Sequence, residues 1–160
     1  MDSQTQQLLL KLIRGQRVAA LGTLRNGAPE VTLVPFAVAS DCTAFYIHIS
    51  RLAHHTQNIQ HDARVSVMVS ETDDGLRNPS SLARVSIQGE AVLVEIDSPD
   101  YDSARSTYLT KFPQAEMMFG LGDFGLYTIV PQTARFVAGF AQTFNLTLTN
   151  FREAGQSRLQ

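Results

Sequence analysis

The sequence has 160 residues, a formal net charge of -2 and a pI near 6.0. A chain of this length usually forms one domain that buries roughly 70% of the surface its unfolded form exposes. No basic block marks a nucleic-acid surface, and no apolar run reaches the roughly 18 residues that a membrane span needs. Cys42 is the only cysteine, so no internal disulfide can form. We therefore expect a soluble, cytoplasmic protein without a nucleic-acid or membrane partner.

The first predicted element is a short helix that ends at Gly15. Ser3 and Gln6 have the spacing of a capping box, which makes Ser3 the expected N-cap. The apolar residues that follow recur on one helical face: Leu8, Leu9, Leu12 and Ile13. This face is expected to cover a barrel end or a partner subunit.

A β-hairpin is predicted next, with strands at 18–24 and 30–39 joined by a turn at Asn26 and Gly27. Pro35 lies inside the second strand and has no N–H to donate to a ladder. It therefore marks an edge, a bulge or a place where something other than a strand meets the backbone. Residues 44–49 form a third predicted strand.

The third strand is predicted to run directly into a short helix over 51–60. Ser50 stands where a helix N-cap belongs. The residues that follow at helical spacings are Leu52, His55, Thr56 and Ile59.

The rest of the chain predicts an antiparallel sheet with one more helix. Two strands are expected at 64–70 and 83–96, on either side of a mobile loop at 71–82. A helix follows that starts at Ser98-Pro99-Asp100. Two closing strands at 124–130 and 134–140 are joined around Pro131, and residues 145–150 extend the sheet. The fold class is therefore mainly β, an antiparallel barrel of Greek-key type with short covering helices. One domain is expected over 1–150, followed by a C-terminal tail at 151–160.

The stretch from Ser50 to Asn58 is the strongest candidate for a binding site. It places a hydroxyl, Arg51 and the adjacent His54 and His55 at one helix start. Helix N-termini attract phosphate through unpaired N–H groups and a dipole that contributes about 0.3 to 1 kcal/mol, and each charged donor adds about 1.5 to 3 kcal/mol. The sequence thus predicts an anion site, with Arg84 as a further donor if the barrel brings it near. A capped helix with a solvated Arg51 explains the same residues.

Several segments carry the pattern of a known family. They are residues 45–59 with 62–66, 27–29 with 34–36, 83–89, 108–113, 123–124 and 138–140. Together they resemble the pyridoxamine 5'-phosphate oxidase-like FMN-binding split barrels, and among these the heme-utilisation branch.

The resemblance implies a homodimer with FMN bound at the subunit interface. It places the FMN phosphate around the helix start and the flavin ring along the preceding strand. The implied cofactor-binding residues are Ser50, His55 and Asn58 on the phosphate side, with Arg51 and His54 beside them, Arg84 from another strand, and Thr32, Val34 and Pro35 at the ring edge through backbone groups.

The sequence departs from the vitamin-oxidising members of this family. It has no tryptophan, and His54 and His55 stand where those members carry an Arg-Lys pair for the phosphate. Imidazoles are mostly neutral at pH 7, so we expect weaker, pH-dependent phosphate binding, and pyridoxamine 5'-phosphate oxidation is disfavoured. Heme degradation is disfavoured too, because the C-terminal region that meets heme in the heme-utilisation members has no counterpart here.

Neither metal binding nor cysteine chemistry is predicted. His54 and His55 point to different helix faces, without carboxylates or cysteines at ligand spacing. Cys42 has no basic neighbour in sequence and is expected to be a bystander. Heme remains a possible ligand, held through His48, His54, His55 or His61, or through a residue other than histidine.

Two functions follow. The first is an FMN-dependent oxidoreductase of unknown substrate, for which the sequence assigns no catalytic residue. The alternative is a non-catalytic module that binds FMN or heme for heme utilisation, storage or sensing.

Overall fold

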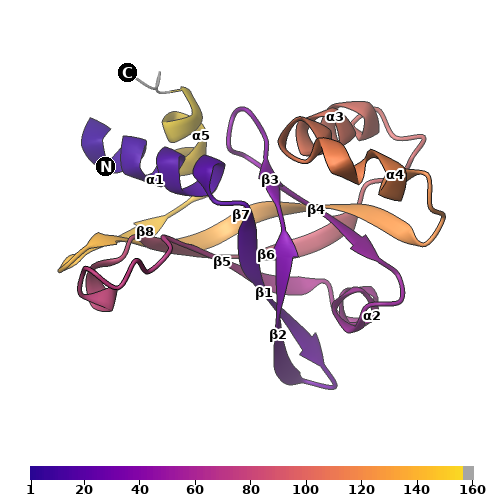
Figure 1. Cartoon of the computed structure of the whole chain (residues 1–160), viewed down its shortest axis with the longest axis horizontal. Helices are drawn as coiled ribbons and strands as arrows, with labels where there is room; N and C mark the ends of the chain where they lie inside the picture. Colours follow the sequence, from indigo (N-terminus) through magenta and orange to yellow (C-terminus); the bar gives the residue numbers. More distant parts are fainter. Residues whose placement is uncertain (157–160) are drawn as a thin grey trace.

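A computed structural model of the chain describes residues 1–156, and an antiparallel sheet forms its body (Figure 1). The strands are β1 (Val18–Arg25), β2 (Ala28–Pro35), β3 (Ala37–Val38), β4 (Phe45–Ser50), β5 (Arg64–Ser70), β6 (Arg84–Leu93), β7 (Phe124–Gly139) and β8 (Gln142–Leu146). The helices are α1 (Ser3–Gly15), α2 (His54–His61), α3 (Tyr101–Lys111), α4 (Glu116–Phe119) and α5 (Leu148–Gln156), with short 3₁₀ turns η1 (Pro79–Ser81) and η2 (Pro113–Ala115).

The sheet closes on itself because its two end strands are neighbours in sequence. The strand order is β2-β1-β5-β6-β7-β4-β3, with β8 paired to β7. Only Phe36 separates β2 from β3, so the ends of the sheet must come together at this residue. The β2 and β4 strands approach each other without pairing and leave a split in the barrel. The predicted antiparallel barrel with covering helices is confirmed.

Helices cover the concave face of the sheet (Figure 1). The α1 and α5 helices pack on one another and on β7, while α3 and α4 lie over the other end of the same side. The largest fully buried side chains include Phe36, Phe45, Phe136, Phe151 and Ile13. None of the helices in residues 1–156 is long and apolar enough to span a membrane.

Two predicted helix starts are wrong. Asp2, and not Ser3, caps α1, since its Oδ1 accepts a 2.8 Å hydrogen bond from the Thr5 N–H. Ser50 is not a helix cap, because pairing with Phe124 makes it the last residue of β4. The α2 helix begins at His54, three residues later than predicted, with Ala53 as an N-cap that makes no side-chain bond.

The end of the chain also differs from the prediction. The two expected closing strands form the single strand β7, since a register shift opposite Gln88 and Gly89 accommodates Pro131 within it. The β8 strand ends at Leu146, and α5 takes up residues expected to extend the sheet and to form a tail. Phe151 on α5 is fully buried and packs edge-on against Phe45. Residues 157–160 of the predicted tail lie outside the described residues.

Candidate functional site

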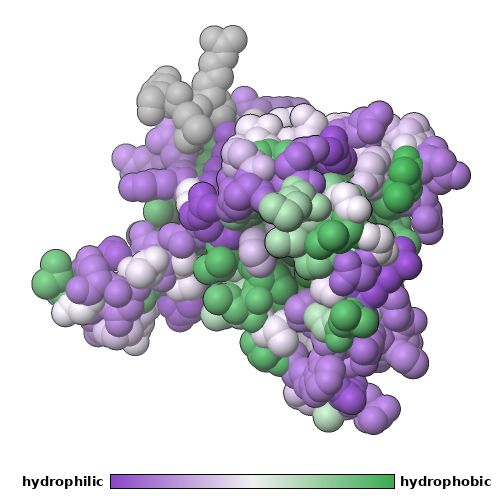
Figure 2. Space-filling model, turned by 45° about the vertical axis from the view of Figure 1, so that its right-hand side comes forward, coloured by the Kyte–Doolittle hydropathy of each residue, from purple (hydrophilic) through white to green (hydrophobic). Residues whose placement is uncertain are grey.

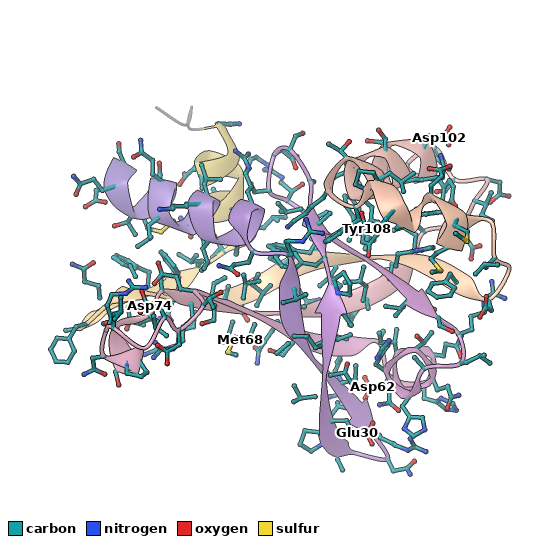
Figure 3. The ribbon with its side chains drawn as sticks, viewed as in Figure 1. Glu30, Asp62, Met68, Asp74, Asp102 and Tyr108 are labelled. Atoms are coloured by element: carbon teal, nitrogen blue, oxygen red, sulfur yellow. The ribbon has the colours of Figure 1, made fainter. Side chains whose placement is uncertain are left out.

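The α2 helix packs on the β1–β2 hairpin through polar side chains. Thr32 Oγ1 lies 3.2 Å from His55 Nδ1, and Arg25 Nη1 lies 2.9 Å from His54 Nδ1. Asn58 Nδ2 donates to Glu30 Oε2 at 2.9 Å, and Glu30 lies on β2 beside α2 in Figure 3. We call this group the α2–hairpin site: Arg25, Glu30, Thr32, His54, His55 and Asn58.

The hairpin turn sets which side chains reach α2. Asn26 and Gly27 both have positive φ, of 51° and 80°, as a tight two-residue hairpin turn requires. The register that follows pairs Arg25 with Ala28 and Thr23 with Glu30. Because side chains alternate along a strand, Glu30 and Thr32 project from the same face of β2. The sequence therefore positions both of them for contact with α2.

One backbone edge of β2 is unpaired among the described residues, since β2 pairs only with β1. Thr32, Val34 and Pro35 all lie on this strand. Val34 is buried, and Pro35 is exposed at the strand end. Of the alternatives that the sequence left open for Pro35, the structure shows a place on an edge strand, and this strand contacts the start of α2 through Thr32 and His55.

Two backbone N–H groups at the start of α2 lack an acceptor within residues 1–156. The N–H groups of Arg51, Leu52 and Ala53 are taken by Asp123 O, Ser50 Oγ and Ser50 O respectively. The N–H groups of His54 and His55 make no such bond. The unpaired donors are therefore those of the two histidines, further along the chain than the sequence predicted.

An acid stands next to Ser50. The Ser50 hydroxyl lies 3.5 Å from Asp123 Oδ2, and the Arg51 N–H donates to the Asp123 carbonyl at 2.6 Å. A carboxylate at this place repels a second anion. Ser50 therefore lies at the least favourable end of the predicted phosphate site, while Arg25 strengthens the other end.

The histidines differ in the nitrogen that carries the proton. Arginine only donates, so the contact with Arg25 makes His54 Nδ1 an acceptor and puts the proton on Nε2. His61 Nδ1 lies 2.7 Å from the Gln57 carbonyl, which only accepts, so His61 Nε2 keeps its lone pair. Burial lowers the pKa of His55. At neutral pH His55 acts as a polar, uncharged group.

Arg84 does not reach the α2–hairpin site in the same copy of the chain. Its guanidinium donates to the carbonyls of Ser80 and Leu82. It lies at the start of β6, where it pairs with Ser70 and Val137. The other end of β6 pairs with Tyr127 on β7, the strand that neighbours β4. Arg51 is exposed and projects from the loop before α2.

His48 lies apart from the other histidines, in an aromatic cluster under α3. Its ring stacks on Phe119 with centroids 3.7 Å apart and lies edge-on to Tyr108. Burial lowers the pKa of His48 to about 4. Within residues 1–156 no three His, Cys, Asp or Glu side chains are grouped to hold a metal ion.

Cys42 is fully buried, and burial raises the pKa of its thiol. Arg14 Nη2 lies 3.6 Å from its sulfur, a basic neighbour that the sequence order did not reveal. Burial outweighs that charge, so the thiol is protonated at neutral pH.

Sequence reasoning missed Arg25, Glu30 and Asp123, and also Thr23, whose hydroxyl accepts a 3.0 Å hydrogen bond from Asn58 Nδ2. Thr23, Arg25 and Glu30 could be found from the hairpin alone, because its two-residue turn fixes the register and the shared face. Asp123 could not, since it meets Ser50 only through the pairing of β4 with β7, whose partners lie more than seventy positions apart.

Comparison with known proteins assigns the fold to a family. The sequence pattern of the family described as pyridoxamine 5'-phosphate oxidase matches residues 5–138. The chain belongs to this family. Its half-barrel is the split barrel of the pyridoxamine 5'-phosphate oxidase fold, as the resemblance implied.

Heme-utilisation proteins of the family are among the relatives. Heme oxygenase HutZ of Vibrio cholerae is 27% identical over 125 residues, which cover 76% of this chain and 69% of HutZ. A heme binding protein from Mycobacterium smegmatis superposes with a TM-score of 0.81 at 22% identity, covering 96% of this chain and 61% of that one. Campylobacter jejuni ChuZ gives 0.79 at 22% identity, with 94% and 62% covered. This chain thus spans about three fifths of the last two proteins.

Proposed function

We propose that this protein binds FMN at the α2–hairpin site and acts as an FMN-dependent oxidoreductase whose substrate is unknown. One observation carries the proposal: an unpaired strand edge on β2 adjoins a helix start with two free N–H groups and Arg25. A planar, hydrogen-bonding ring suits the first feature, and a phosphate suits the second. Family membership favours a flavin over other ligands that combine these parts.

The residues present fit an FMN phosphate at the His54 end of the site. The N–H groups of His54 and His55 are available, Arg25 lies beside His54, and Arg51 is exposed nearby. Asn58 fixes the hairpin against α2 and serves as a positioning residue. Thr32, Val34 and Pro35 would meet the ring edge through their backbone. When bound, FMN supplies hydride or electron transfer, and the protein orients it and shields it from water.

The convex face of the sheet supports a homodimer. Val31 and Leu33 on β2 are 71% and 69% exposed, and Met68 on β5 is 41% exposed. Met68 extends from the side of the sheet away from α1 (Figure 3), and hydrophobic side chains gather on the surface below the helices in Figure 2. Cross-strand pairing places small residues among them: Ala20, Gly22, Ser66 and Ser86. An apolar face with small residues packs well on a second copy.

A second copy would also complete the site. A pocket of about 390 Å³ opens on this face, lined by Gly22, Thr23, Pro29, Ser66 and Gln88 among others. Thr23 belongs to the hydrogen-bond network of the α2–hairpin site. Arg84 is too far along β6 to reach that site from the same copy, so we propose that it contributes from the second copy.

Fluorescence quenching during titration with FMN tests the proposal. We expect micromolar or tighter binding, about -8 kcal/mol or more favourable. Replacing Arg25 with Ala should weaken FMN more than riboflavin, which lacks the phosphate. A flat FMN titration would refute FMN binding, and equal losses for both ligands would place the phosphate elsewhere. Anaerobic reduction with NADPH or NADH, followed by candidate acceptors, then separates turnover from binding alone.

The second candidate function is a module that binds heme, and the heme-related relatives favour it. The observation specific to this chain is the exposed His61, whose Nε2 lone pair is held free by the Nδ1 contact with Gln57. His54 is the matched contrast, because its Nε2 carries the proton. If heme binds through His61, H61A should abolish the Soret shift of added hemin and H54A should not. Equal spectra for wild type and H61A would refute this ligand.

A further inference from the structure

A second pocket lies on the helical side of the sheet, away from α2. It has a volume of about 460 Å³ and lies between α1, β3 and α3. Figure 1 shows α1 and α3 on the same side of the sheet with the loop between β3 and β4 rising between them. The lining residues are Arg14, Ala37, Val38, Ser40, Ser106, Thr107, Thr110 and Lys111. None of them belongs to the α2–hairpin site.

Lys111 is fixed in place at the wall of this pocket. Its ammonium donates to the carbonyl of Gln16, at the end of α1, and lies 4.2 Å from the centroid of the Phe36 ring. An ammonium has three N–H groups, so this single hydrogen bond leaves others to donate. The half-buried side chain is thus held with unused donors.

The cations around the pocket form no ion pair among the described residues. Arg14 donates to the Ser40 carbonyl at 2.7 Å, and Arg17 lies over the Phe112 ring. The ion pairs formed within residues 1–156 involve other arginines: Arg64, Arg77 and Arg105. The acid next to Ser40, Asp41, instead accepts hydrogen bonds from the Thr43 N–H and hydroxyl.

The surroundings of Lys111 change the pKa of its ammonium. Burial and the charge of Arg17 lower the pKa of its ammonium to about 8. A half-buried cation without an anionic partner loses part of its hydration, and a bound anion offsets that cost.

We propose that this pocket binds a small molecule bearing a carboxylate or phosphate group, held between the Lys111 ammonium and the Arg14 guanidinium. Arginine offers a planar pair of donors to such a group, and the ammonium adds a point charge. The Ser106 and Thr107 hydroxyls line the same pocket and supply neutral donors for the rest of the molecule. The competing explanation is that both cations only hold the C-terminal ends of α1 and α3.

The chain offers a sharp test, because Lys11 and Lys111 are its only lysines. Incorporation of lysine labelled with ¹³C at Cε leaves both ammonium groups chemically unchanged and gives a separate NMR signal for each, and K11R and K111R assign the two signals. We expect millimolar inorganic phosphate or acetate to move the Lys111 signal and to raise its pKa by about one unit, compared with sodium chloride at equal ionic strength. The exposed Lys11 signal serves as the internal control.

The arms of the experiment separate the ligand classes. A response to phosphate alone identifies a phosphate-bearing ligand, and a response to both anions identifies a general anion site. If neither anion moves the Lys111 signal more than the Lys11 signal, the cations serve only the helix ends and the proposal is wrong. The titration is made on the wild-type protein, so its result does not depend on whether a Lys111 variant folds.

Discussion

The side-chain amide of Asn58 on α2 donates a 2.9 Å hydrogen bond to Glu30 Oε2 on β2. The same nitrogen donates to Thr23 Oγ1 on β1 at 3.0 Å, so one side chain ties the helix to both strands of the hairpin. Asn58 and Thr23 are buried, and Glu30 is half-buried. The orientation of the amide is fixed by two different acceptors, and this holds His54 and His55 against the hairpin.

Replacing Asn58 with Leu should destabilise the protein by about 1 to 3 kcal/mol, because it leaves Glu30 and Thr23 without their donor in a poorly hydrated place. Urea denaturation measures the loss. Gln57→Leu, at the exposed neighbouring position, is the matched control and should change stability little. If N58L and Q57L were equally stable, the amide would not be what joins α2 to the hairpin.

The hairpin half of the site follows from local sequence, and the helix half does not. The Asn26-Gly27 turn fixes the register that brings Glu30 and Thr32 to one face. The start of α2 depends instead on β4, which extends through Ser50 because its ladder with β7 ends at Phe124. Ser50 has the composition of an N-cap, but distant pairing overrides that preference.

The C-terminal helix shows the same limit. Its residues carry a weak local signal, and α5 is stabilised by contacts with remote elements. Phe151 packs on Phe45, and a Cβ added to Gly155 would lie 2.4 Å from the carbonyl oxygen of Asp41. The sequence shows an apolar residue and a glycine here, but not the surface that they fit.

Removing the carboxylate of Asp123 should strengthen FMN binding, whereas most substitutions in a binding site weaken it. Asp123→Asn removes a negative charge 3.5 Å from the Ser50 hydroxyl. If the FMN phosphate lies near the start of α2, its affinity should rise about five-fold, which corresponds to about 1 kcal/mol. Riboflavin binding should stay the same. Asp102→Asn on α3, remote from α2 in Figure 3, is the control for a general change in net charge. Weaker FMN binding by D123N would argue against a phosphate near the start of α2.

His48 should make the protein less stable as the pH falls from about 6.5 to about 4. Its pKa is lowered from 6.5 to about 4 in the folded protein, so in this window the unfolded chain binds a proton that the folded protein does not. The full loss is about 3 kcal/mol below the folded pKa, at 1.36 kcal/mol for each pKa unit.

His48→Phe isolates this contribution. Phenylalanine keeps the stacking on Phe119 and removes the titrating group. The free energy of unfolding, measured by urea denaturation at several pH values, should therefore fall less steeply toward pH 4 in H48F than in the wild type. His55 and the carboxylates titrate in both proteins, so they cancel in the difference. Parallel curves would show that folding leaves the pKa of His48 unchanged.

Met68 tests the proposed dimer face. Its side chain lies between Ala20 and Ser86 in the cross-strand register, on the convex side of β5. Met68→Lys would place a charge at the centre of an apolar contact, where desolvation costs several kcal/mol. Light scattering coupled to size exclusion should show a dimer for the wild type and a monomer for M68K. FMN binding should be lost together with the dimer, because the pocket beside Gly22 and Ser66 would be open to solvent.

Ile96→Lys, also exposed but beyond the end of β6, is the control and should stay dimeric. A dimeric M68K would move the interface to another face, and a monomeric M68K with unchanged FMN affinity would place the whole cofactor site within one copy.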